Sequence, residues 1–286
     1  MLRLRPRLLS TVFFTVVTTI ALSSATPAFA QPLGSARAWS VTAGVDFPTV
    51  YIFRGIVQNY PVHEGDHTLT MTPHADVDVK LTDSGSVRAG ASTWNSFNTG
   101  TSGSGGPLDS AYSVAQFTGR VSVALANGLT ITPSFFINTS PNDGYDPIRE
   151  IDVTVAHNGR YAPYAMVAFE LSDSGQLDEG QKKGRYLEVG ATPRWGRRRI
   201  VLSIPVKAGF SVGDYYELLG RDLTFTDHKF GFVEGGARLM VPLGSRFGAW
   251  SVVGGADVYV FGDATRAFNL GDKYRAVGTI GVAYRH

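Results

Sequence analysis

The chain of 286 residues contains 26 Lys and Arg, 24 Asp and Glu, and no Cys. The absence of Cys excludes a disulfide framework, thiol catalysis and Cys-ligated zinc or iron–sulfur sites. Three of the basic residues, Arg3, Arg5 and Arg7, lie at the N-terminus, and without them 23 basic residues stand against 24 acidic ones. The rest of the chain lacks the basic excess of a nucleic-acid-binding protein, so we expect no nucleic-acid partner.

The first thirty residues are typical of a secretory signal peptide. After the three arginines an apolar stretch covers residues 8–22, and a small-residue cleavage site ends at Ala30. An N-terminal membrane anchor is the alternative, but the apolar core is short for a helix that crosses a bilayer. We expect residues 1–30 to be removed and residues 31–286 to form a single exported domain.

After residue 30 the sequence contains no run of eighteen apolar residues, which excludes a helical membrane protein. Apolar and polar residues instead alternate, most clearly over residues 68–81, about twice the usual length of a strand in a soluble protein. A tilted membrane crossing needs strands of about ten residues. The pattern predicts twelve strands, at residues 39–58, 68–81, 86–97, 111–126, 128–139, 147–157, 161–171, 184–195, 199–211, 228–243, 247–262 and 273–285.

The connections between these strands alternate in length. Short ones, with the Asn, Asp and Gly residues of tight hairpins, fall at 83–85, 127–128, 158–160, 196–198 and 244–246. Long ones fall at about 59–67, 98–110, 140–146, 172–183, 212–227 and 263–272. Bacterial outer-membrane barrels have short periplasmic turns and long outer loops. We therefore predict an all-β fold: a single antiparallel up-and-down transmembrane β-barrel of about twelve strands, with both termini in the periplasm.

A soluble exported β-sandwich is the alternative fold that the composition allows. Strand length and loop asymmetry disfavour it. For a barrel in the bacterial outer membrane we expect three partners: the membrane lipid, the barrel-assembly machinery and small hydrophilic solutes.

The first predicted strand carries a string typical of a known family. In residues 46–58, Tyr51, Phe53, Arg54, Gly55 and Gln58 match the Tyr-x-Phe-Arg-Gly-x-x-Gln string of the TorF-type porins. The segment Trp94-Asn95-Ser96-Phe97 in the third strand is a further similarity to this family. The resemblance implies an outer-membrane barrel with a porin role. Such barrels commonly end on an aromatic residue, whereas this chain continues for two residues after Tyr284.

Charged residues at alternate strand positions are expected to face the lumen, opposite the apolar residues that meet lipid. The candidates for pore lining are Arg54, Asp76, Asp78, Lys80, Arg88, Arg120, Glu150, Asp152, Glu170, Glu188, Arg194, Glu234 and Arg238. Asp46, Lys207, Asp257 and Arg275 are expected to join them, which gives nine acidic and eight basic groups. Because large fields of a single sign select ions, this balance predicts weak charge selectivity.

The size of the predicted barrel leaves the state of its lumen open. Eight-stranded barrels are filled by side chains and sixteen-stranded ones hold a channel, so twelve strands lie between these cases. Either the lumen is a narrow passive channel for small hydrophilic solutes, or its charges pair into a plug-like network. Arg54 is expected to pair with carboxylates of neighbouring strands such as Asp76 or Asp78, with solute binding as the alternative.

Two rival classes remain beside a channel. One is a closed structural or surface-binding barrel whose long loops bind something outside. The other is an outer-membrane hydrolase, for which His74 and His157 are candidates, although neither has a motif-like neighbourhood. We therefore expect no enzymatic activity, while the solute and the oligomeric state stay open.

A five-residue string at 63–67, His-Glu-Gly-Asp-His, matches the H-E-x-x-H pattern of zinc hydrolases. That chemistry requires a helix that places both His residues on one face, and Pro61 and Gly65 disfavour a helix here. We expect a solvated loop, with no metal and no cofactor; catalytic zinc and adventitious metal binding are the alternatives.

Overall fold

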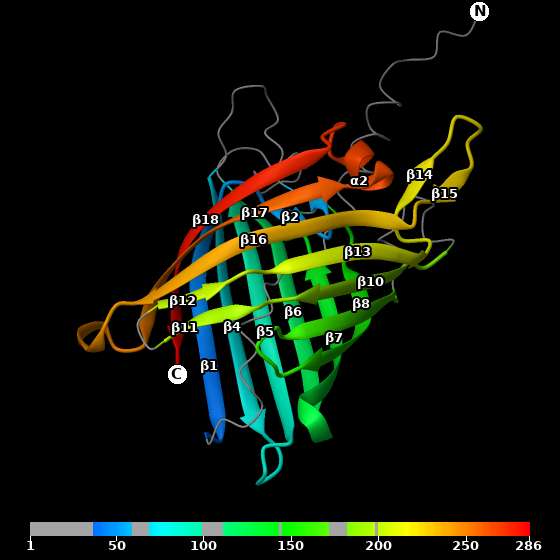
Figure 1. The fold of residues 1–286 in the computed structure, drawn as a ribbon. Coiled ribbons are helices and arrows are strands. Elements are labelled where there is room, and N and C mark those ends of the chain that lie inside the picture. The colour runs from blue at the N-terminus through cyan, green and yellow to red at the C-terminus, as the bar shows by residue number, and fades with distance from the viewer. Residues whose placement is uncertain (1–36, 59–68, 99–110, 143–144, 172–181, 198–199) are drawn as a thin grey trace, which may run out of the picture.

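The computed structural model describes residues 37–58, 69–98, 111–142, 145–171, 182–197 and 200–286 (Figure 1). Twelve antiparallel segments make up the barrel wall, and we call each of them a stave because some consist of two strands. Together they form a closed all-β barrel. Each stave pairs with the next along the chain, and the last strand closes the barrel against the first, with Phe47 opposite Ile280. The predicted fold class is confirmed.

Most staves are single strands of eight to thirteen residues. They are β1 (Trp39–Pro48), β4 (Thr70–Lys80), β5 (Val87–Asn98), β6 (Tyr112–Ala124), β7 (Leu129–Thr139), β8 (Ile148–His157), β9 (Pro163–Glu170), β16 (Phe230–Pro242), β17 (Trp250–Phe261) and β18 (Tyr274–Arg285). These lengths suit a tilted crossing of the membrane.

Two neighbouring staves are each divided in two by a proline. One consists of β10 (Arg185–Ala191) and β11 (Arg194–Arg197), the other of β12 (Ile200–Ser203) and β13 (Val206–Gly213). Proline has no N–H to give to the ladder, so Pro193 and Pro205 interrupt the regular pairing. The two breaks lie side by side, because the Ile204 N–H donates to the Pro193 carbonyl at 3.0 Å.

The two ends of the barrel differ in the way that the loop lengths predict. One end carries tight turns, among them the short helices η1 (Ala126–Gly128) and η2 (Ser245–Phe247). The other end carries the hairpin of β14 (Glu217–Leu219) with β15 (Phe225–Asp227) and the helix α2 (Asp263–Phe268), which lie above the barrel in Figure 1. By the usual orientation of bacterial barrels, the turns are periplasmic and the longer connections lie outside.

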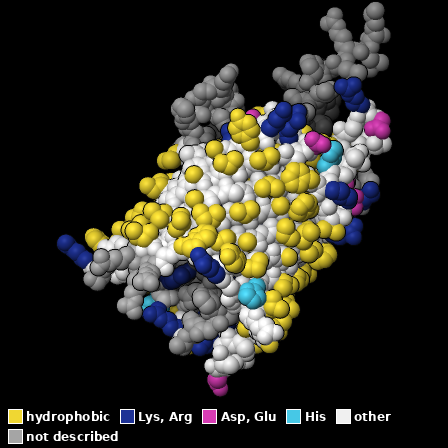
Figure 2. Space-filling view, in the orientation of Figure 1, with side chains coloured by type: hydrophobic (Ala, Val, Ile, Leu, Met, Phe, Trp, Pro, Cys, Tyr) yellow, Lys and Arg dark blue, Asp and Glu magenta, His cyan; other side chains and the backbone are white. Residues whose placement is uncertain are grey.

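The outer wall is apolar. Side chains at alternate strand positions are exposed and hydrophobic, and Figure 2 shows them spread over the barrel wall, with charged side chains mainly near its ends. They include Val77, Phe117, Phe135, Ile151, Phe169, Val189, Val233, Leu239, Val258 and Ile280. A closed barrel with this surface belongs in lipid, and the protein is a bacterial outer-membrane barrel. No helix among the described residues is long and apolar enough to cross a bilayer.

The predicted first strand, residues 39–58, is too long. The pairing of β1 with β4 ends at Asp46 and its pairing with β18 ends by Thr49, after which the chain leaves the wall and enters the lumen. Residues 52–57 form a small hairpin there, made of β2 (Ile52–Phe53) and β3 (Ile56–Val57). Ten residues already suffice for the crossing, and the run from Val50 to Phe53 is continuously apolar, as suits a segment buried on all sides.

Candidate functional site

An inward hairpin, residues 51–58, occupies the outer part of the lumen. Its tip is formed by Arg54 and Gly55, whose φ angles are +41° and +80°. A two-residue hairpin turn with both central residues at positive φ is of the type I′ kind. The glycine is needed for a second reason: a Cβ on it would lie 2.7 Å from the ring of Phe232. The local sequence thus specifies both the turn and a close approach to β16.

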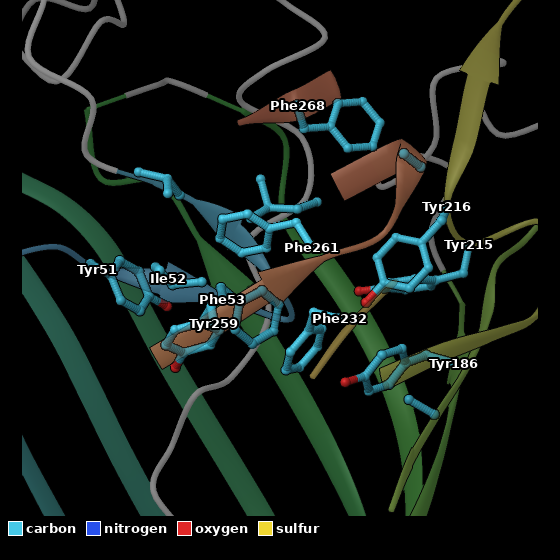
Figure 3. Close-up of a cluster of buried hydrophobic side chains, with 14 of the residues drawn as sticks. Tyr51, Ile52, Phe53, Tyr186, Tyr215, Tyr216, Phe232, Tyr259, Phe261 and Phe268 are labelled. Carbon is cyan, nitrogen blue, oxygen red and sulfur yellow. The ribbon is translucent and has the colours of Figure 1, made fainter. Parts of the chain in front are cut away.

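The hairpin is packed into an aromatic core inside the barrel. Figure 3 shows Tyr51, Ile52 and Phe53 from the hairpin facing rings from the wall and from the outer connections. Phe53, Tyr186, Tyr216 and Phe232 have no measurable exposure. The other buried members are Ile56, Val57, Val114, Phe136, Ile148, Ala168, Tyr215, Tyr259, Phe261, Ala264, Phe268 and Val277. The hairpin is therefore held by strands around much of the circumference.

The guanidinium of Arg54 lies at the centre of this core. Its Nη1 and Nη2 donate to the two carboxylate oxygens of Glu150 at 3.1 and 2.8 Å, a bidentate pair. Nη1 also donates to the hydroxyl of Tyr215 at 2.9 Å, and the cation lies 4.2 Å from the ring centroid of Tyr186. Burial by itself lowers the pKa of Arg54, but the Glu150 carboxylate and the other acidic and phenolic groups around it together outweigh burial, so the pKa lies above its ordinary value. The hairpin tip stays charged.

The outer connections hold the hairpin backbone. Tyr216 donates its hydroxyl proton to the Arg54 carbonyl at 2.8 Å. Asn269, at the end of α2, donates to the Gly55 carbonyl at 2.7 Å and accepts from the Val57 N–H at 2.9 Å. These contacts join two segments predicted as loops to the hairpin. In the first of these loops, the adjacent tyrosines Tyr215 and Tyr216 were a sequence signal for a buried segment. Nothing in the sequence pointed to Asn269 in the second.

The predicted partners of Arg54 are wrong. Asp76 and Asp78 are instead bound by Arg120, each at 2.7 Å, two strands away on the same wall. Arg54 cannot take those carboxylates because it leaves the wall with the hairpin and meets β8 from inside the barrel. Strand alternation predicts which side chains face inward, but it does not predict which of them meet across the lumen.

A second charged network lies on the wall formed by β10, β13, β16 and β17. Lys207 lies 3.0 Å from Glu234 and 3.8 Å from Glu188, and Arg238 lies 2.9 Å from Asp257. The Glu188 carboxylate also accepts from the hydroxyls of Tyr164 at 2.6 Å and Tyr186 at 2.9 Å. The network joins the aromatic core because Tyr186 belongs to both.

No family model matches the chain, and no curated protein matches it. Solved structures resemble it in fold. An outer membrane channel from Pseudomonas putida F1 aligns over 89% of this chain and 98% of its own, with 7% identity and a TM-score of 0.49. Outer membrane phospholipase A from Escherichia coli aligns over 94% and 97%, with 11% identity and a TM-score of 0.48. The NanC porin aligns over 86% and 99%, with 10% identity and a TM-score of 0.47.

Similarity at this level concerns the barrel fold alone. Membership of the TorF-type family stays a prediction, and so do the signal peptide and the barrel-assembly partner.

The remaining pore-lining candidates lie on the inner side of the strands. Arg88, Asp152 and Glu170 are buried, whereas Lys80 and Arg194 are half-buried. Glu170 accepts from the Gly184 N–H at 2.9 Å at the outer end of β9. That any of these groups lines a conducting pore stays a prediction.

Of the two hydrolase interpretations, the zinc one gains no support from the described residues, and the serine-type one gains only an acidic neighbour for His74. The H-E-x-x-H string at 63–67 lies outside them, and within them no group of three metal-ligating side chains comes together. His74 lies 3.8 Å from Asp46 and 3.3 Å from the Thr72 carbonyl, so its near contacts are a carboxylate and the backbone. His157 ends β8 beside the periplasmic turns.

Proposed function

We propose that the protein is a narrow, passive, porin-like channel for small hydrophilic solutes, with the inward hairpin as its constriction. The observation that carries the proposal is that inward-facing charges keep part of their surface accessible. The side chains of Arg120, Asp78 and Arg238 are 18, 24 and 22% exposed. Charged groups on strands whose other face meets lipid can remain accessible only towards the lumen, which supports a hydrated interior.

The hairpin gives the proposed channel its narrow part. It lies at the outer end of the lumen, whereas Arg120 and Arg238 lie nearer the periplasmic ends of β6 and β16. A solute would therefore pass the aromatic region around the hairpin and then a region lined by charges. The mixture of nine acidic and eight basic groups supports weak charge selectivity overall.

The resemblance to TorF-type porins supports the same function. Its matched residues, Tyr51, Phe53, Arg54, Gly55 and Gln58, are residues of the hairpin, and its Arg-Gly pair forms the tip. In this chain the string therefore lies in the inward hairpin and not in a membrane strand.

A closed surface-binding barrel is the second candidate, and one observation favours it. Leu219 and Leu223 in the β14–β15 hairpin are 50 and 78% exposed, at the end of the barrel that faces outside. Exposed apolar side chains on a projecting hairpin are typical of a contact surface.

Planar-bilayer recording separates the two candidates. The refolded, purified protein is expected to give discrete conductance steps. The absence of such steps would refute the channel and favour the surface-binding barrel. A lipid-cleavage assay on the same preparation tests the hydrolase alternative. Cleavage that is lost on replacement of His74 or His157 would overturn the proposal of a passive channel.

A further inference from the structure

Two cationic residues share one register level near the periplasmic end of the lumen. Lys80 on β4 and Arg88 on β5 are direct register partners. Like charges directly opposite each other in a sheet are destabilising, and the end of the Lys80 side chain lies beside Gly85 of the connecting turn. On its other side Arg88 is the register partner of Ser122 on β6, so its neighbour there carries a hydroxyl and not a carboxylate.

Arg88 is buried with part of its guanidinium unsatisfied. The residue is 5% exposed, its Nη1 has no hydrogen-bond partner, and its Nη2 reaches only the Asp78 carbonyl, at 3.5 Å. Within the described part of the chain it forms no ion pair. A buried guanidinium in this state carries a large desolvation penalty, which a bound anion would offset.

The two carboxylates that precede Lys80 along the inner face of β4 are already engaged. Asp76 and Asp78 each lie 2.7 Å from Arg120, so these carboxylates pair with that guanidinium and not with Arg88. This part of the wall holds three cations, Lys80, Arg88 and Arg120, and two carboxylates, so its net charge is one positive. The local balance therefore fits one monovalent anionic group.

A neutral donor completes the arrangement. The hydroxyl of Thr132 donates to the Ser122 oxygen at 3.0 Å. Because that oxygen acts as the acceptor, the proton of Ser122 is available for another group. One register level of the wall thus carries a guanidinium, an ammonium group and a hydroxyl, from Arg88, Lys80 and Ser122.

We propose that Arg88, Lys80 and Ser122 form an anion-binding site in the periplasmic half of the lumen, which takes the carboxylate or phosphate group of a small soluble molecule. Guanidinium forks bind such oxyanions in bidentate fashion. The site gives the proposed channel a class of solute, and only its part in transport rests on that proposed function.

Titration of the refolded full-length barrel in detergent with inorganic phosphate tests the site. Wild-type protein is expected to bind phosphate, Arg88→Gln at least about tenfold more weakly, and Lys80→Gln also more weakly. Arg266→Gln removes the same charge from the exposed helix α2 at the other end, and is expected to bind like wild type. Heat-modifiable gel migration checks that each variant forms a barrel, and Lys80→Gln keeps the test valid if Arg88→Gln does not fold.

The site is refuted if wild type does not bind phosphate, or if Arg88→Gln and Lys80→Gln bind as tightly as wild type. Because the titration needs no conduction, it is separate from the bilayer experiment. A barrel that conducts without binding phosphate overturns the site alone, and one that binds phosphate without conducting overturns the channel alone.

Discussion

Arg54 and Glu150 form a bidentate ion pair inside the barrel, and neither side chain is exposed to solvent. They are 96 residues apart in the sequence, one at the tip of the inward hairpin and the other near the outer end of β8. The pair therefore fixes the position of the hairpin relative to the wall. Because the wall closes through its own strand pairing, loosening the hairpin need not open the barrel.

Replacing Glu150 by Gln is the first test of this relationship. It removes the carboxylate that is hydrogen-bonded to Arg54, and breaking a buried ion pair in this way costs about 3–5 kcal/mol and favours displacement of the hairpin. We expect larger single-channel conductance steps than in wild type, with heat-modifiable migration retained. Asp83→Asn, in an exposed periplasmic turn, is the matched control and should conduct like wild type. Unchanged steps in Glu150→Gln would mean that the hairpin does not set the conductance.

A second prediction concerns the backbone of the hairpin tip. In Gly55→Ala the new methyl group meets the ring of Phe232, and the φ of +80° disfavours any side chain. We expect a loss of about 1–3 kcal/mol in the free energy of unfolding, measured by urea titration in lipid vesicles, together with larger conductance steps.

Gly119→Ala is the control for that substitution. It lies on the wall, where an added Cβ meets nothing within 4 Å and φ is not positive. Its stability and conductance should match those of wild type. Equal behaviour of the two variants would show that the tip tolerates a side chain and that the close contact with β16 is not required.

The strands could be predicted from the sequence because each has one face in lipid, so alternation marks them. The hairpin could not, because alternation has no meaning for a segment that is buried on all sides. Two signals pointed to it: Pro48, which can end a strand, and the unbroken apolar run from Val50 to Phe53. The inward orientation of Glu150 follows from its even position, whereas its pairing with Arg54 depends on a fold across the lumen.

The buried tyrosines of the outer connection predict a pH dependence. Burial raises the pKa of Tyr215 and of Tyr216 well above the ordinary value of about 10. Above that pH the unfolded chain loses phenolic protons that the folded protein keeps, so the unfolded state binds fewer protons and stability falls as pH rises. We expect a flat contribution below pH ~10 and a decline above it.

Tyr215→Phe tests the assignment of that decline. It removes one of the groups responsible, so the free energy of unfolding should fall less steeply above pH ~10 than in wild type. It also removes the acceptor of a hydrogen bond from Arg54, so the variant should be less stable at neutral pH by about 1–3 kcal/mol. Parallel pH curves for the two proteins would show that Tyr215 is not among the titrating groups.

The last prediction concerns the lipid-facing side of the wall. Phe135 lies in the middle of β7, 43% exposed, with Ile151 opposite it on the same face. An arginine near the bilayer midplane of a barrel costs about 2–4 kcal/mol, because its charge meets hydrocarbon. Phe135→Arg should lose that amount in urea unfolding from vesicles, whereas Phe135→Leu should lose much less, since Leu remains apolar. If the two variants were equally stable, Phe135 would face water, and the assignment of this surface to lipid would have to be given up.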